Sequence, residues 1–193
     1  MVHMSDNRII IERFVRSFEK YDELLVPEYY DPITEQFAIK SPTESDRRHW
    51  QPVSQETGRD KLDSLYSKLP GRLPLLFEEL LLTFRWAEVN LKLVRLVANP
   101  LGDDLSGFEQ EVFKDRGLSS ILLDGGFTQF GKAADYNYDP ICFDTRKRSK
   151  DGDCRIVRLD HEEVLCNSRL KEVSQIAPSF RELALLITED AKG

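Results

Sequence analysis

The sequence is poor in cysteine and has no long apolar run, either in its first residues or elsewhere. Three cysteines occur among 193 residues: Cys142, Cys154 and Cys166. An odd number of cysteines, in a chain whose first residues contain no long apolar segment, predicts reduced thiols and a cytoplasmic protein. The richest apolar run, Leu73–Phe84, is interrupted by Glu78 and Glu79. It is too short to cross a bilayer, so no membrane partner is expected.

Common catalytic and metal-binding motifs are also missing. The chain contains no G-x-S-x-G elbow, no P-loop and no G-x-G-x-x-G turn. A zinc site made of the cysteines and His161 is disfavoured, because the cysteines stand twelve residues apart and form no close pair. The stretch Asp151-Gly152-Asp153 lacks the ligand ladder of a calcium loop. We therefore expect no metal ion, no cofactor and no enzymatic activity.

Acidic residues outnumber basic ones. There are 34 Asp and Glu against 27 Lys and Arg, which gives a net charge of −7. A negative protein repels phosphate backbones and anionic lipids, so nucleic-acid binding is disfavoured. A basic protein partner would be attracted. The apolar content of 40% lies in the globular range and excludes a wholly disordered chain.

The N-terminal third predicts one helix and an irregular extension. Apolar residues recur at helical spacing within Asp6–Leu25: Ile10, Phe14, Phe18 and Tyr21. Such a stripe most often docks a helix onto a core. Proline and polar residues dominate Tyr29–Arg59, which favours loops and short extended pieces. We place a boundary near Lys61, with a helix and irregular extension over residues 1–60 and the main domain over residues 61–193.

Two further helices have clear signals. Pro74 suits the first turn of a helix whose apolar stripe includes Leu76, Phe77, Leu80, Leu81 and Phe84. On this helix Glu78 and Glu79 are expected to lie on the opposite, polar face. Near the C-terminus, Ser179 and Glu182 have the spacing of a capping box, which predicts a helix over residues 180–188.

The stretch Tyr138–Glu163 predicts two strands and a tight turn. Apolar residues alternate with others after Tyr138, the period of a strand. Asp151-Gly152 is the strongest hairpin turn signal in the chain. The acidic run Asp160–Glu163 allows two interpretations. It could supply paired carboxylates for acid/base chemistry, or it could be a solvated strand end, and we favour the second.

Four pieces of the sequence occur in a characteristic order. They are LPGRLPLLFEELLLTFRW, GGFTQFGKAADYNYDPICFDT, CRIVRLDHEEV and IAPSFRELALLI. In this order they resemble the SMI1/KNR4-like family of the SUKH superfamily, over about two thirds of the chain, from Leu69 onward. The sequence departs from the family where Phe84-Arg85-Trp86 leads to Ala87-Glu88 rather than to an Asn-Gly pair. The first sixty residues have no counterpart.

The resemblance implies an α+β domain with a mostly antiparallel sheet flanked by helices, and it implies binding rather than catalysis. Bacterial members of the family resemble immunity proteins that neutralise toxins, many of them nucleases, and fungal members resemble signalling hubs. The leading hypothesis is thus an intracellular immunity protein with a basic toxin domain as its partner. A regulatory scaffold is the alternative.

A small hydrolase that uses His161 with Glu162 or Asp160 is a third, less favoured hypothesis. For protein binding, the candidate contact residues are Asp144, Asp160 and Glu162, because together they would form an acidic surface.

Overall fold

The computed structural model describes residues 3–21, 37–39, 49–135 and 137–191. Its helices are α1 (His3–Ser17), α3 (Leu62–Tyr66), α4 (Leu75–Thr83), α5 (Ser106–Val112), α6 (Arg116–Asp124), α7 (His161–Asn167) and α8 (Phe180–Asp190), with short 3-10 turns η1 (Phe18–Lys20) and η3 (Arg59–Lys61). Its strands are β1 (Ala38–Ile39), β2 (His49–Trp50), β3 (Val53–Ser54), β4 (Phe84–Arg85), β5 (Val89–Asn90), β6 (Arg95–Leu96), β7 (Phe127–Lys132), β8 (Pro140–Arg148), β9 (Cys154–Leu159) and β10 (Glu172–Ala177).

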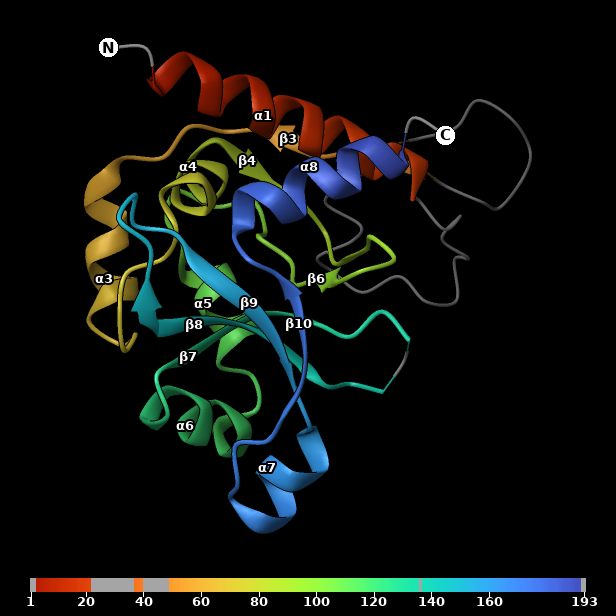
Figure 1. The fold of residues 1–193 in the computed structure, drawn as a ribbon. Coiled ribbons are helices and arrows are strands. Elements are labelled where there is room, and N and C mark those ends of the chain that lie inside the picture. The colour runs from red at the N-terminus through yellow and green to blue at the C-terminus, as the bar shows by residue number, and fades with distance from the viewer. Residues whose placement is uncertain (1–2, 22–36, 40–48, 136, 192–193) are drawn as a thin grey trace.

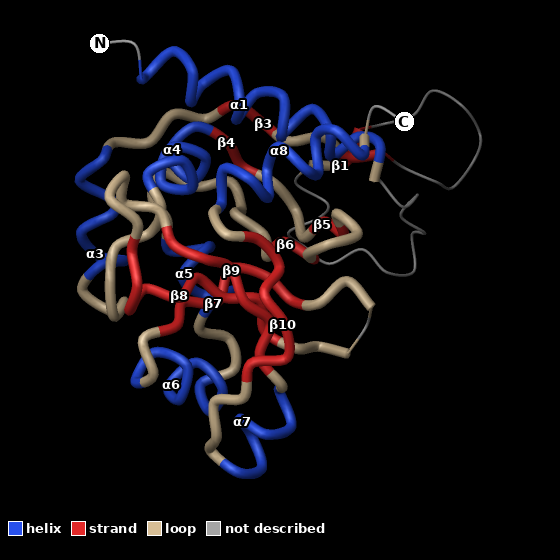
Figure 2. The backbone as a smooth tube through the Cα atoms, viewed as in Figure 1, coloured by secondary structure: helices blue, strands red, loops and turns tan. Residues whose placement is uncertain are grey.

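One antiparallel sheet forms the centre of the molecule (Figure 2). Its six strands follow the order β10-β9-β8-β7-β6-β5, so neighbours in space are also neighbours in sequence. Two small antiparallel pairs, β1 with β2 and β3 with β4, lie outside it. The predicted α+β class with a mostly antiparallel sheet is therefore confirmed.

Helices cover both faces of the central sheet (Figure 1). On one side lie α1, α4 and α8, and on the other lie α6 and α7. The two faces carry different residues because successive side chains of a strand point to opposite sides. In β8, Phe143 belongs to the larger core under α4 and α8, whereas Cys142 belongs to the smaller core under α6 and α7.

The apolar stripe of the first helix is a docking face, as predicted. Phe14 and Phe18 are each 1% exposed, and α1 packs along α8 and α4. The α-helix ends at Ser17 and is followed by the 3-10 turn Phe18–Lys20, so it is shorter than the predicted Asp6–Leu25. Much of the irregular segment Tyr29–Arg59 lies outside the described residues. Trp50, within that segment, is buried in the larger core. The boundary near Lys61 stays a prediction.

The hairpin turn and the last helix follow their sequence signals. At the β8–β9 turn, Ser149 N donates to Asp153 O at 2.8 Å and Gly152 N donates to Ser149 O at 3.0 Å. Gly152 has a φ of +83°, which glycine adopts without a steric penalty. In α8, the Ser179 side chain accepts a hydrogen bond from Glu182 N, so the predicted cap is confirmed. The helix continues two residues past the predicted end, to Asp190.

The expected exposure of Glu78 is wrong. Its side chain is fully buried, with Arg59 Nη1 2.7 Å from its Oε2 and a hydrogen bond from the Tyr66 hydroxyl. Because η3 and α3 cover the polar side of α4, Glu78 faces a second layer of protein instead of solvent. Burial, together with Glu78, raises the pKa of the Tyr66 hydroxyl.

Among the described helices, none has both the length and the apolar character to cross a membrane.

Candidate protein-binding surface

Asp144 is enclosed by arginine side chains. Its side chain has no exposed area, and its carboxylate accepts hydrogen bonds from Arg146 Nε at 2.8 Å and from Arg155 Nε at 3.0 Å. Arg155 also forms two hydrogen bonds of 2.9 Å with Glu172 in β10. Asp144 therefore ties β8 to β9, and through Arg155 to β10, and its carboxylate is poorly placed to meet a partner directly.

The hydrogen bonds of Asp144 make folding stability depend on pH. The bond from Arg146 lowers the pKa of Asp144 below its usual value of 3.8; burial opposes this, and Arg155 adds to the lowering. A carboxyl group whose pKa is lower in the folded state stabilises the fold fully above its unfolded pKa. This stabilisation disappears as the pH falls through the folded-state pKa.

We expect Asp144→Asn to lower the free energy of unfolding by about 2 kcal/mol near pH 6, because asparagine removes the charge from both bonds. The difference from the wild-type protein should begin to shrink below about pH 4, where the carboxyl group of the unfolded chain takes up a proton, and it should vanish once the pH falls below the lowered folded-state pKa. Urea unfolding, followed by circular dichroism across this pH range, measures the difference. A gap that stays constant down to about pH 2 would show that the charge of Asp144 contributes nothing.

Asp160 begins a helix, contrary to the predicted strand end. Strand β9 ends at Leu159, and Asp160 Oδ1 accepts a hydrogen bond of 3.1 Å from Glu163 N in the first turn of α7. Its other oxygen lies 3.0 Å from Lys171 Nζ. The spacing of Asp160 and Glu163 is itself a helix-start signal, with an acceptor at the N-cap and an acid three residues later. This signal was missed because the acids were assigned to the preceding strand.

Glu162 is the predicted contact residue that faces solvent. It lies in the first turn of α7 and is exposed, and its side chain forms no ion pair within the described part of the chain. The neighbouring Glu163 has a cation beside it, because its Oε2 lies 2.7 Å from Arg169 Nη2. The three predicted residues thus do not form one acidic surface, and Glu162 is the one of them that is exposed and has no ion pair with another described residue.

His161 is paired with a residue that the sequence did not indicate. Its Nδ1 lies 2.9 Å from Asp139 Oδ1, and its backbone N donates to the same oxygen at 3.0 Å. Arg158 Nε donates to the other oxygen of Asp139 at 2.6 Å. Neither Asp160 nor Glu162, the acids of the hydrolase hypothesis, has a hydrogen bond to the His161 ring among the described residues.

Asp139 therefore joins the loop before β8 to the start of α7. Only 7% of the residue is exposed. Burial raises its pKa, but the hydrogen bonds from His161 and Arg158 outweigh burial, so the net pKa is lowered and the carboxylate stays charged. Arg158 also reaches Asp135 Oδ2 at 2.8 Å, on the far side of the same loop. No spacing rule connects Asp139 with His161, because they meet only when β8 and β9 pair.

The cysteines are placed as separate thiols. Cys142 and Cys154 are buried and Cys166 is exposed, and burial raises the pKa of Cys154 to about 12. The described residues bring no three metal-ligating side chains together.

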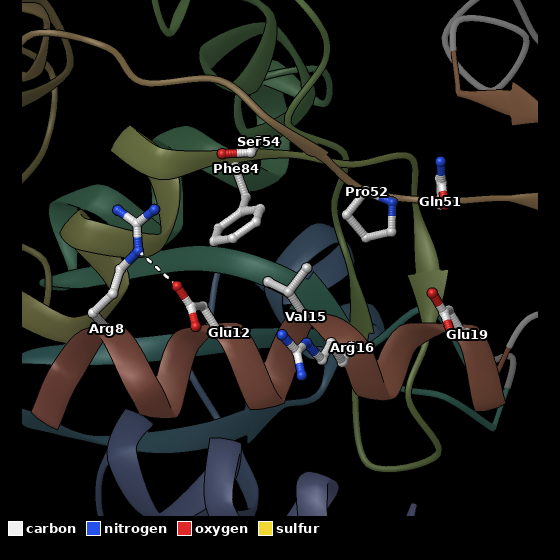
Figure 3. A pocket seen from close by; sticks show the side chains of 9 residues that line it. All are labelled: Arg8, Glu12, Val15, Arg16, Glu19, Gln51, Pro52, Ser54 and Phe84. Carbon is white, nitrogen blue, oxygen red and sulfur yellow. Dashed lines mark hydrogen bonds and ion pairs between the residues drawn. The ribbon is translucent and has the colours of Figure 1, made fainter.

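A hollow of about 330 Å³ lies between α1 and the segment that holds β2 and β3 (Figure 3). Val15, Pro52 and Phe84 line it with apolar surface, and Arg8 Nε pairs with Glu12 Oε1 at 3.1 Å beside them. Because charges of both signs line the hollow, it has no evident preference for a cation or an anion. Its walls come from distant parts of the sequence, so no local pattern could predict it.

The chain matches no model of a known protein family, no curated protein sequence and no solved structure. The structure shows the α+β architecture. At the start of α7, it places the exposed Glu162 next to the loop that Asp139 joins to His161. The SMI1/KNR4-like resemblance stays an expectation from sequence motifs.

Proposed function

We propose that the chain is a non-enzymatic protein-binding domain and acts inside the cell as an immunity protein that neutralises a cognate toxin. The observation that supports this most is the exposed carboxylate of Glu162, which has no ion pair among the described residues and lies on a well-fixed surface. The Asp139–His161 hydrogen bonds hold that surface in place. Partner proteins bind best to surfaces that are ordered before contact, since less conformational entropy is then lost on binding.

The charge of the whole chain supports a basic partner. A net charge of −7 attracts a positively charged toxin domain and speeds its encounter with the chain. Within that general attraction, an exposed carboxylate such as Glu162 favours the orientation that brings a lysine or arginine of the partner to α7. Charges at the rim of an interface act chiefly on the association rate and its salt dependence.

Co-expression tests the proposal. The toxin domain encoded beside this chain is produced in bacteria with and without the chain. We expect growth to be restored by the chain, and the two proteins to co-purify as a complex. If the toxin domain remains lethal and does not bind, or if no toxin is encoded beside the chain, the immunity role is wrong. Specific binding to a cellular regulator instead would favour the scaffold alternative.

The His161–Asp139 pair keeps the hydrolase hypothesis testable, because an aspartate that orients a histidine is a common element of acid/base sites. His161→Ala decides between the two views. A hydrolase that depends on this histidine would lose any hydrolytic activity detected in the wild-type protein. A binding domain would keep its neutralising activity in the co-expression assay, because the backbone N–H of residue 161 still donates to Asp139 when the ring is removed.

A further inference from the structure

Tyr138 adopts a backbone conformation that a bulky residue normally avoids. Its φ is +58°, in the left-handed region, and 62% of the residue is exposed. It is the most exposed of the large apolar residues in the described part of the chain. Glycine or asparagine would be the usual choice for this conformation in a loop. Strain of this kind clusters at functional sites, where the surrounding structure enforces it.

The residue that follows Tyr138 is held from three directions. Asp139 O accepts a hydrogen bond of 2.8 Å from Ala133 N, across the base of the loop. The Asp139 carboxylate is bound by His161 and Arg158, as described above. The backbone on one side of Tyr138 is therefore fixed, and the ring is presented to solvent from a rigid base. Among the described residues, the ring belongs to neither hydrophobic core, so the packing of these cores does not require an aromatic side chain there.

The neighbouring surface adds charge and apolar area. The hydrogen bonds between Asp139 and His161 bring this loop to the first turn of α7. On α7, Glu162 is exposed and Leu165, one turn further along, is 46% exposed. These two residues stand three positions apart and so share one side of the helix.

We propose that Tyr138 is the anchor residue through which the chain binds its protein partner. The partner that fits is a folded protein with an apolar cleft for the tyrosine ring and a lysine or arginine at the rim to pair with Glu162. Tyrosine is enriched among the few residues that dominate interface energies, because it buries a large area at a small cost in entropy. This inference rests on the proposed protein-binding function and names the residue that would carry it.

Replacing Tyr138 separates binding from folding. Tyr138→Gly removes the ring and also relieves the backbone strain, so the melting temperature should stay the same or rise by about 2 °C. Affinity for the purified toxin domain encoded beside the chain, measured by calorimetry, should fall by at least about tenfold. Tyr138→Phe keeps the ring and should bind within about threefold of the wild-type protein. Tyr138→Asn, which also tolerates positive φ, repeats the test with a side chain.

Leu75→Ala is the matched control, because Leu75 is 52% exposed but lies on α4, and its binding should equal that of the wild-type protein. If Tyr138→Gly and Tyr138→Asn bind the toxin domain as tightly as the wild-type protein does, Tyr138 is not the anchor, while the binding function stands. If the wild-type protein itself does not bind the toxin domain, the proposed function fails and the anchor fails with it.

Discussion

Phe77→Ala is expected to lower the free energy of unfolding by about 4 kcal/mol, which corresponds to a fall in melting temperature of about 12 °C. Phe77 is fully buried, and its ring meets four others. The ring centroids lie 4.9 Å from Phe180, 5.0 Å from Phe143, 5.5 Å from Phe130 and 6.0 Å from Phe108. These rings come from α8, β8, β7 and α5, so the removal of one side chain leaves a cavity where α4 meets both helices and the sheet.

The expected loss of unfolding free energy exceeds the contribution of the lost apolar area alone, because the sheet and α8 cannot both move into the cavity that Phe77 leaves. Thermal and urea unfolding measure the effect. On the same helix, Leu75→Ala is the control, since Leu75 is 52% exposed and its loss should change stability by less than about 0.5 kcal/mol. A loss below about 1 kcal/mol for Phe77→Ala would contradict the packing described for this core.

Among substitutions of the charged residues of the candidate surface, Asp139→Ala should lower the free energy of unfolding most, by about 3 kcal/mol. The substitution leaves the His161 backbone N–H without its acceptor, and it leaves the largely buried Arg158 with only the more exposed Asp135 as a carboxylate partner. The Asp139 side chain is only 10% exposed and that of Arg158 only 18%, so water cannot easily replace the lost bonds. Breaking such a pair from one side costs more than the pair itself contributes, because the remaining charge stays desolvated.

Asp135→Ala separates this effect from a simple loss of charge. Asp135 contacts the same arginine, but its side chain is 51% exposed, so its removal should cost less than about 1 kcal/mol. Equal losses in the two variants, measured by urea unfolding near neutral pH, would show that burial of Asp139 is not what makes it important. Asp139→Ala should also weaken partner binding, because the loop that carries Tyr138 would lose its attachment to α7.

Local signals in the sequence predicted the elements that depend on local physics. The Asp151-Gly152 turn, the Ser179 cap and the apolar stripe of α1 each require only residues within a few positions, and all three are confirmed. The α+β class was expected from the SMI1/KNR4-like resemblance, and the predicted hairpin and amphipathic helices agree with it.

Features that depend on distant contacts could not be predicted. Glu78 lies on the polar face of its helix, but η3 and α3 cover that face. The position of η3 and α3 depends on tertiary contacts, which no local sequence pattern shows. Asp139 gave no signal because its partners belong to β9 and α7. The prediction for Asp160 was wrong for a different reason. Its helix-capping pattern was present in the sequence, but the residue was assigned to the end of a strand.

The affinity of Glu162→Lys for the toxin domain encoded beside the chain tests the central claim most directly. Glu189→Lys is the matched control, because Glu189 is also exposed but lies near the end of α8. We predict that Glu162→Lys binds about tenfold more weakly at low salt, that this difference shrinks at high salt, and that Glu189→Lys binds almost as well as the wild-type protein. Equal affinities for the two lysine variants, at low and at high salt, would contradict the assignment of the binding surface to the start of α7.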